Sequence, residues 1–328
     1  MLAVGRSKVS FIVAAFNGAD FLVRCLDSLL AQTIAVEVVV VDDGSTDGTP
    51  ELLEGYRSRV TILRQSNQGV SAARNAGFAA SHGELVCFLD QDDWVEPEYA
   101  ERLAASLDAD EQAVAAYGDR VEHSTLGGIE NEKIVVLRDR GRNPRLALLP
   151  EMFLVSPGAL LIRRSALERA GAFESRFSSA GEDWDLCLRL ADLGTFAYVP
   201  QPLFHYRRHH ASGLHRGFMT IHRGCKRLLR AQRRRLRDER EQAALREGFR
   251  NLYRMTAQHW WLRRRTFGLK AELVKPLLSD PALALWIFGV RLRSLRRRLG
   301  LLAAERPTPP PVAEPRRMAS VAEQGAVE

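Results

Sequence analysis

Short apolar runs alternate with stretches of helical periodicity in the first 90 residues of the chain. Four runs have the length and the β-branched content of strands: KVSFIV (8–13), VEVVVV (36–41), VTILRQ (60–65) and ELVCFL (84–89). The segments between them, over about 20–32, 50–57 and 70–81, have the character of helices, the first with apolar residues at helical spacing. Strands that alternate with helices at this pace are typical of a parallel sheet, so the sequence predicts an α/β fold.

Polar clusters follow three of these strands. Phe16-Asn17, Asp42-Asp43 and the stretch from Asp90 to Asp93 each come directly after an apolar run. Ligands of open α/β sheets bind outside the carboxyl ends of the strands. We therefore expect all three clusters at the ligand-binding edge of the sheet.

Two aspartates end the second strand. In VVVVDDGSTDGT, Asp42 and Asp43 precede Gly44, which allows a tight turn. A carboxylate at this edge can accept hydrogen bonds from a base N–H or a ribose hydroxyl, as acidic residues do in dinucleotide folds. Because Asp, Gly, Ser and Thr also dominate turns and helix caps, a capped turn explains the same residues.

Three carboxylates occupy four positions in FLDQDDW, residues 88–94. Asp90 and Asp92 are alternate residues, which point the same way in an extended chain and can reach one ligand. Mg²⁺ and Mn²⁺ prefer oxygen ligands, and Mg²⁺ commonly takes one or two carboxylates together with phosphates. The cluster is a candidate site for a metal and a diphosphate, and the alternative is a solvated acidic loop. Asp93 is interpreted as a cap for the turn that follows.

Two further stretches place charged side chains on helices. GEDWDLCLRL begins a helix with Glu182, Asp183 and Asp185. The helix dipole alone favours acids there, but one of these carboxylates is also a candidate general base. In QSNQGVSAARNAG, Arg74 and Asn75 lie on a helix that begins near a glycine turn. This arrangement suits a cation that approaches a phosphate or a nucleobase, although an ordinary solvated arginine fits equally well.

The second part of the chain differs in charge. Residues 201–328 hold 28 Lys and Arg against 10 Asp and Glu, which leaves 19 against 30 for residues 1–200. After a looser region over about 104–150, strand and helix signals return up to residue 210, and the chain beyond 217 is helical and basic. Such a basic region indicates contact with an anionic partner.

One basic segment has a continuous apolar stripe. In LWIFGVRLRSLRRRLGLL, residues 285–302, apolar side chains repeat at spacings of three and four, and arginines occupy the other faces. An amphipathic helix on the inner membrane leaflet and a helix packed on the catalytic domain both explain this pattern. Nucleic-acid binding is not expected, because no helix-turn-helix or RNA-binding signature accompanies the charge.

The remaining features favour a reducing compartment. Cys25, Cys87, Cys187 and Cys225 form no CxxC pair, so we expect reduced thiols. The N-terminus lacks the pattern of a signal peptide, and no uncharged apolar run reaches the length of a membrane span. We expect a cytoplasmic protein, with peripheral contact at the inner face of the plasma membrane as a further expectation.

Five segments, taken in order, resemble family 2 of the inverting glycosyltransferases, which have the GT-A fold. They are VSFIVAAFNGADFLVRCLDSLLAQ, VVVDDGSTDGT, NQGVSAARNAG, GELVCFLDQDDW and GEDWDLCLRLADLG. The similarity covers roughly residues 8–210. It implies a Rossmann-like, mostly parallel sheet flanked by helices, followed in this chain by a basic helical C-terminal region.

The resemblance implies a nucleotide-diphosphate sugar as donor, with a UDP-sugar as the first expectation, and Mg²⁺ or Mn²⁺ as cofactor. Asp183 would be the catalytic base, with Glu182 beside it. Asp92 would be the direct metal ligand, with Asp90 and His209 at the same metal. The last of these lies in YRRHHAS, which matches a loop that can close over the diphosphate. The nucleotide-sugar site would include Ala15, Phe16, Asn17, Asp42, Asp43, Arg74, Asp90, Gln91 and Arg207.

The chain departs from the family pattern in its first motif. Ala14 and Phe16 stand where the family usually has Pro and Tyr, so one hydroxyl contact is lost and ring stacking remains. A Gln-x-x-Arg-Trp motif and the membrane helices of processive synthases are also missing from the sequence. The absence of that motif and of those helices favours a single, non-processive transfer.

The sequence thus predicts a catalytic domain over residues 1–215, whose nucleotide-sugar half ends near residue 100 and whose acceptor half follows. A basic helical region would cover 216–304, and a disordered tail 305–328. The acceptor would be a glycan or a lipid-linked hydroxyl in the synthesis of a cell-surface glycan or glycolipid. The alternatives are a nucleotide-sugar-binding pseudoenzyme, which the intact acids argue against, and a metal-dependent nucleotidyltransferase, which lacks its glycine loop here.

Overall fold

The computed structural model describes residues 8–125, 130–140, 142–174, 180–209 and 217–262. Contacts between Cα atoms divide the chain into residues 1–252 and 253–328, and of the second unit only the end of one helix is described. The amphipathic segment 285–302 and the tail 305–328 lie outside the described residues. The domain boundary near residue 216 stays a prediction.

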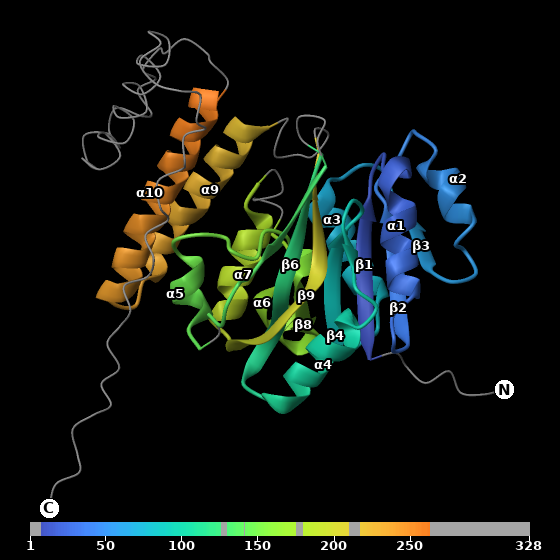
Figure 1. The fold of residues 1–328 in the computed structure, drawn as a ribbon, viewed down its shortest axis with the longest axis horizontal. Coiled ribbons are helices and arrows are strands. Elements are labelled where there is room, and N and C mark those ends of the chain that lie inside the picture. Colours follow the sequence, from blue (N-terminus) through green and yellow to red (C-terminus); the bar gives the residue numbers. More distant parts are fainter. Residues whose placement is uncertain (1–7, 126–129, 141, 175–179, 210–216, 263–328) are drawn as a thin grey trace, which may run out of the picture. The chain divides into compact units, whose positions relative to one another are not determined.

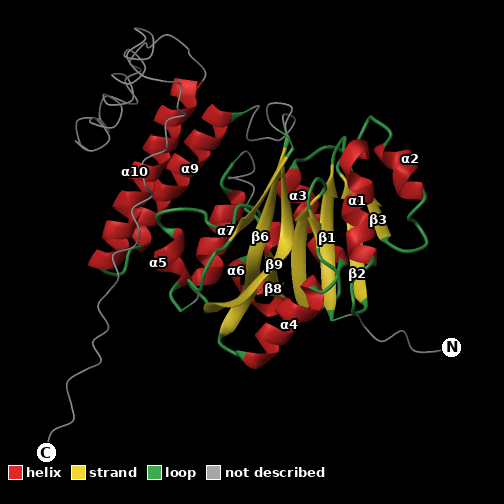
Figure 2. Cartoon of the chain, in the orientation of Figure 1, coloured by secondary structure: helices red, strands yellow, loops and turns green. Residues whose placement is uncertain are grey.

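A mixed sheet forms the centre of the first unit (Figures 1 and 2). Its strands are β1 (Val9–Ala15), β2 (Val36–Asp42), β3 (Thr61–Arg64), β4 (Leu85–Asp90), β5 (Trp94–Val95), β6 (Ala113–Ser124), β7 (Asn131–Val135), β8 (Leu160–Arg163) and β9 (Thr195–Arg208). They pair in the order β3-β2-β1-β4-β8-β6-β9-β5, and β7 pairs with β6. The first four strands are parallel to one another, while β8 is antiparallel to both of its neighbours.

Helices cover the faces of this sheet (Figure 2). The helices that the structure describes are α1 (Ala19–Leu30), α2 (Thr49–Glu54), α3 (Val70–Ala80), α4 (Tyr99–Ala109), α5 (Pro144–Leu148), α6 (Arg164–Ala170), α7 (Glu182–Ala191), α9 (Phe218–Gln232) and α10 (Glu239–Leu262), of which the last two lie beside the sheet rather than on its faces (Figure 1), with the 3₁₀ turns η1 (Pro157–Ala159) and η3 (Arg233–Arg235). Because helices pack on both sides, strands β1, β2 and β4 are buried over most of their length, which explains their continuous apolar sequence. The expected α/β architecture is therefore confirmed.

The region over 104–150 is more ordered than its sequence indicated. It contains β6, a strand of 12 residues in the interior of the sheet. Its first half reads AVAAYG, and small alanines lack the apolar bulk by which strands are recognised. They are nevertheless fully buried, because β8 and β9 pair with β6 on either side. Tertiary pairing rather than local propensity makes this segment a strand.

The described helices include none with the length and apolar character needed to cross a membrane. The four cysteines are free thiols, and burial raises the pKa of each above its ordinary value, to about 12 for Cys87 and Cys225. The expectation of reduced thiols is therefore met in the structure.

Candidate active site

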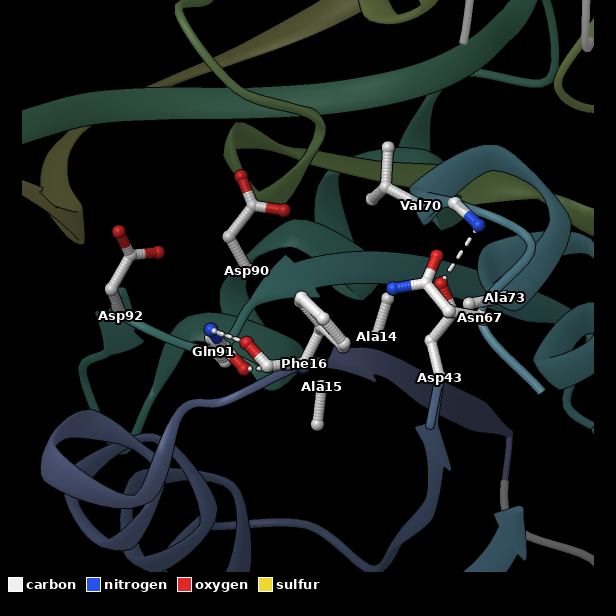
Figure 3. Close-up of a pocket in the computed structure, with 11 residues that line it drawn as sticks. Ala14, Ala15, Phe16, Asp43, Asn67, Val70, Ala73, Asp90, Gln91 and Asp92 are labelled. Atoms are coloured by element: carbon white, nitrogen blue, oxygen red, sulfur yellow. Dashed lines mark hydrogen bonds between the residues drawn. The ribbon is translucent and has the colours of Figure 1, made fainter. Parts of the chain in front are cut away.

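The ends of three neighbouring parallel strands meet at one edge of the sheet. The register pairs Ala15 of β1 with Asp42 of β2, and Ala14 with Asp90 of β4. A pocket of about 320 Å³ opens there, which is large enough for part of a nucleotide. Its lining is Ala14, Ala15, Phe16, Asp43, Asn67, Gly69, Val70, Ala73, Asp90, Gln91 and Asp92 (Figure 3).

An aromatic ring stands at the centre of this lining. Phe16 is 44% exposed, although it is a large apolar side chain. Its backbone is held by the amide of Gln91, which accepts from the Phe16 N–H (2.9 Å) and donates to the Phe16 carbonyl (3.2 Å; Figure 3). Gly18 leaves room for that amide, because a Cβ at this position would overlap it. The ring is thus presented to the pocket at a fixed place, as a platform on which a planar base can stack.

Asn17 supports the same loop from outside the pocket lining. Its backbone is in the left-handed region (φ 49°), a conformation that asparagine tolerates better than most residues. Its side-chain oxygen accepts from Thr46 N (2.9 Å), and its own N–H donates to Ser45 Oγ (3.0 Å). Asn17 therefore ties the loop after β1 to the loop after β2.

The two carboxylates at the end of β2 are almost fully enclosed by donors. Asp42 accepts from the N–H of Ser45 (2.8 Å), so it caps the turn that follows. Asp43 accepts from Gln65 Nε2 (2.7 Å) and from two backbone N–H groups of the loop before α3, at Gln68 and Gly69 (2.9 and 2.8 Å). Only Asp43 reaches the pocket wall. Asp42 thus caps a turn, as one of the two interpretations of the sequence expected. Asp43 holds neighbouring loops together and also lines the pocket.

The carboxylates at the end of β4 are arranged differently. Asp90 accepts from Arg74 Nη2 (2.6 Å) and from Ser156 Oγ (3.1 Å). Asp92 lies 2.9 Å from Nε2 of His209. Burial raises the pKa of Asp92, and the neighbouring Asp90 adds to the rise, because both negative charges share a site with little water. In the view of Figure 3 these carboxylates and Asp43 lie on opposite sides of Phe16.

Asp93 has a different role from the turn cap that the sequence indicated. Its carboxylate is buried and accepts from the backbone N–H of Arg207 (2.9 Å), so it fixes the end of β9 beside the pocket. The other oxygen has no partner among the described residues, and burial raises the pKa of this group well above its ordinary value. Asp93 therefore positions the segment that carries Arg207 and His209.

Arg74 joins the pocket to α7. Its guanidinium, 4% exposed, donates through Nη1 to Asp183 (2.7 Å) and through Nη2 to Asp90 (2.6 Å). Glu182 lies 3.9 Å from the same guanidinium, and the ring of Phe173 lies below it with 4.9 Å between the ring centroid and Cζ. Arg74 is therefore committed to carboxylates and is not among the residues that line the pocket. Its guanidinium connects two acids that are 93 residues apart in the sequence.

Asp183 has the character of a base that titrates near neutrality. Burial raises the pKa of its carboxyl to about 7; Arg74 opposes this rise, and Glu182 and Asp90 add to it. Burial also raises the pKa of Glu182, one oxygen of which is enclosed without a partner among the described residues. Gly181, with φ 93°, permits the sharp entry into α7 that directs both acids toward Arg74. Asp185 points elsewhere, since it is paired with Arg189 at 2.8 Å.

The donor groups near Asp92 fit a hard divalent cation. Two carboxylates line one pocket, an imidazole lies against one of them, and the repulsion from Asp90 that raises the pKa of Asp92 would be relieved by a cation. No three His, Cys, Asp or Glu side chains within the described parts of the chain converge as a complete metal cage. A cation would therefore share its coordination with phosphate oxygens, as Mg²⁺ usually does.

Arg207 is placed against aromatic rings. Its Cζ lies 5.0 Å from the ring centroid of Trp94 and 5.2 Å from that of Phe21, and it does not line the pocket. His209 also packs on Phe21, with ring centroids 4.5 Å apart. The rest of the expected closing loop lies outside the described residues, so closure over a diphosphate stays a prediction.

Some residues of the site were not expected from the sequence. The pocket wall includes Asn67, Gly69, Val70 and Ala73, and Ser156 binds Asp90 from η1's N-cap position. The pocket-wall residues could have been recognised from the sequence, because SNQG is a turn-forming stretch and its glycine, with φ 88°, directly precedes the helix. Ser156 carries none that could be recognised, since it is 66 residues from its partner.

Comparisons with known proteins identify relatives of this chain. Residues 10–171 match the model of the family described as Glycosyl transferase family 2. The putative glycosyltransferase EpsH of Bacillus subtilis is 31% identical over 220 residues, which are 63% of this chain and 63% of EpsH. The match thus spans less than two thirds of that relative.

Solved structures show the same fold at low sequence identity. TarS residues 1–349 of S. aureus, in complex with UDP-GlcNAc, superpose with a TM-score of 0.65 at 18% identity, over 82% of this chain and 79% of TarS. The mannosyltransferase PcManGT of Pyrobaculum calidifontis, in complex with GDP-Man and Mn²⁺, gives a TM-score of 0.56 at 21% identity, over 91% and 84%. The mostly parallel, helix-flanked fold is therefore shared with both.

Proposed function

Because the chain belongs to glycosyl transferase family 2, we propose that it transfers a sugar from a nucleotide-diphosphate sugar to an acceptor hydroxyl, with inversion at the anomeric carbon. The observation that carries the proposal is the connection from the pocket to Asp183 through Arg74. It links a carboxylate with a pKa of about 7 to a pocket that is large enough for part of a nucleotide. Such a carboxylate can take the proton that the acceptor hydroxyl loses while the nucleoside diphosphate leaves.

The donor would lie along the ends of β1, β2 and β4. Phe16 would stack on the base, and the wall at Asp43 would face the base or the ribose. UDP is the first candidate nucleotide, since TarS is described with UDP-GlcNAc; PcManGT, which is described with GDP-Man, makes a guanine nucleotide the second. The diphosphate would then extend toward Asp90 and Asp92 at the far side of Phe16.

Asp92 and His209 would hold Mg²⁺ or Mn²⁺, with Asp90 on the same side of the pocket. A bound divalent cation stabilises the negative charge that develops on the leaving diphosphate. Asp90 is already neutralised by Arg74, so Asp92 is the better direct ligand. Arg207 at the end of β9 and His209 just after it would approach the phosphates of a bound donor.

Asp183 would accept the proton of the attacking hydroxyl. Its carboxylate is oriented by Arg74, so the lone pairs that remain can face an acceptor bound next to the pocket. Attack from that side displaces the diphosphate in line, and a single displacement inverts the anomeric configuration. Glu182 would shape the local charge, because its own oxygen is enclosed beside Arg74.

The acceptor belongs to the same proposal as a hydroxyl of a glycan or a lipid-linked sugar used in cell-surface polymer synthesis. Peripheral contact with an anionic membrane would bring such an acceptor within reach. The proposed transfer is single and non-processive, as the missing Gln-x-x-Arg-Trp segment indicates.

The decisive experiment measures nucleotide release. The purified protein is incubated with Mn²⁺, a panel of UDP- and GDP-sugars and a mixture of lipid-linked and free glycan acceptors, and free UDP or GDP is quantified. We expect release with one donor, dependent on the cation and increased by one acceptor. Calorimetric binding of UDP or GDP without release from any donor would contradict the transferase and favour a nucleotide-sugar-binding pseudoenzyme.

A further inference from the structure

Helix α9 presents arginines along one exposed face. Arg223, Arg227 and Arg230 on α9 and Arg234 in the following turn η3 are spaced by four, three and four residues, which places them on one side of a helix. All four are exposed. The 15 residues of α9 include no Asp or Glu. These four residues, called the arginine stripe below, form a line of like charge about 16 Å long, given a rise of about 1.5 Å per residue.

Arginines close by in the sequence are neutralised within the fold. Arg235 and Arg237 bind Asp192 at 2.9 and 2.7 Å, and the buried Arg145 is held by Asp192 and Glu241. Within the described ranges, Arg223, Arg230 and Arg234 have no ion pair of this kind. Arg230 and Arg234, four residues apart on one side of the helix, repel each other, so an anionic partner would stabilise this side.

The opposite side of α9 packs against the segment that leads into α7. Leu228 and Leu229 are fully buried on that side. Gly224 touches the residue before Gly181, since a Cβ at Gly224 would overlap the carbonyl oxygen of Ala180. Glu182 and Asp183 follow directly in the chain. The body of α9, whose diameter is about 10 Å, therefore separates the arginine stripe from the start of α7.

We propose that the arginine stripe docks the protein on an anionic lipid bilayer, and the part of this proposal that concerns acceptor delivery to Asp183 rests on the proposed function. Arginines near an anionic leaflet each strengthen attachment about fivefold, and the effect falls off within a Debye length. A line of four exposed charges on a helix suits a flat anionic surface. Single-stranded nucleic acids are instead bound in basic grooves with aromatic stacking platforms, and no aromatic side chain of α9 is exposed.

The stripe also accounts for where an acceptor would enter. An acceptor anchored in a bilayer that touches the stripe would lie about one helix diameter from the start of α7, where Asp183 is placed. A soluble donor would reach its pocket from the carboxyl ends of the parallel strands. The two substrates would thus approach Asp183 from two different elements of the fold.

The experiment measures binding to vesicles by co-sedimentation, without donor or acceptor. Three full-length proteins are compared with the wild type: the stripe variant R223Q/R227Q/R230Q/R234Q, the same four positions changed to Lys, and a control R57Q/R59Q/R102Q/R169Q. The control removes four arginines that are exposed on other elements, so its change in net charge is the same. Vesicles contain phosphatidylcholine alone or with about a third phosphatidylglycerol, the anionic component.

We expect the wild type to bind anionic vesicles in a salt-dependent way and the stripe variant to bind about tenfold more weakly or worse. The Lys variant and the control should bind like the wild type. Thermal unfolding of each variant shows whether the fold is kept, and if the fourfold Gln variant unfolds, R223Q/R234Q is compared with R57Q/R169Q in its place. Equal losses in the stripe variant and the control, or no loss in either, would overturn the proposal.

Nucleic acid is tested in the same series. A stripe variant that loses affinity for a duplex DNA but not for vesicles would also overturn membrane docking. Release of UDP or GDP with a water-soluble acceptor should be unchanged in the stripe variant. Vesicle binding without any release in the wild type would refute the proposed function alone, whereas release without vesicle binding would refute the docking proposal alone.

Discussion

The ends of β2 and β4 each carry a pair of carboxylates, but the protein surrounds the two pairs differently. Asp42 and Asp43 receive hydrogen bonds from backbone N–H groups and a glutamine of neighbouring loops. Asp90 is neutralised by a buried arginine, and Asp92 keeps a pKa raised by burial and by Asp90. The first pair is satisfied by the fold alone. The second pair, with Asp183, retains unbalanced charge, and that is the electrostatic condition of a site that handles cations and protons.

The strongest test of this difference is Asp183→Asn. Asparagine keeps a hydrogen-bond acceptor for Arg74 but cannot accept a proton, so we expect the rate of transfer to fall by about 10²–10⁴-fold. Affinity for the nucleotide should stay within about threefold of the wild type, because Asp183 does not line the donor pocket. Nucleotide release gives the rate, and calorimetry gives the affinity. Normal turnover by the purified variant would remove Asp183 from the role of base.

Two matched variants, one at the end of β4 and one at the end of β2, separate binding of the cation from binding of the nucleobase. Asp92→Asn removes a charge that we place at the cation, so the gain in UDP or GDP affinity caused by Mn²⁺ should fall by about tenfold or more. Asp43→Asn should weaken nucleotide binding by a similar factor with and without Mn²⁺, since it lies on the other side of Phe16. Calorimetric titrations with and without Mn²⁺ measure both. A Mn²⁺ effect that survives in Asp92→Asn would show that the cation binds elsewhere.

Both pairs of acids could be located from the sequence, but their surroundings could not. Apolar strands of known direction place Asp42 and Asp90 at one edge of the sheet, and the register of β1 confirms it. The sequence around Arg74 shows only a cation on a helix. Its partner Asp183 lies 109 residues away, and the pairing depends on how α7 packs after β8 has been inserted between β4 and β6. Spacing along the chain carries no information on such contacts.

The pH dependence of transfer sharpens the comparison further. The pKa of Asp183 is raised to about 7 mainly by burial, so its carboxylate forms as the pH rises through that value. We expect kcat/KM to fall about tenfold for each pH unit below 7 in the wild type. In Arg74→Lys the guanidinium that binds both Asp183 and Asp90 is lost, so the carboxylate of Asp183 is less stabilised and its pKa should rise. The fall in kcat/KM at low pH should therefore begin about one pH unit higher than in the wild type.

As a control, the affinity of Arg74→Lys for the nucleotide is measured at pH 8 and compared with that of the wild type. A merely structural effect of Arg74→Lys would lower the rate at all pH values and leave the limb in place. A limb at the same pH in both proteins would therefore show that Arg74 does not set the proton affinity of the base.

The smallest effect is expected for Asp42 at the end of β2, where the fold itself supplies the hydrogen bonds of the carboxylate. Asp42→Asn keeps the oxygen that accepts from Ser45 N–H and loses only the charge that faces the exposed Arg64, whose Nε lies 3.4 Å from Asp42 Oδ2. Because such a partly solvated pair contributes little, we expect the free energy of unfolding to fall by about 1 kcal/mol. Chemical denaturation measures this value, and transfer per folded molecule should stay within about twofold of the wild type. If Asp42→Asn instead abolished nucleotide binding, the turn cap would be a ligand contact as well, and the contrast between the two strand ends would be lost.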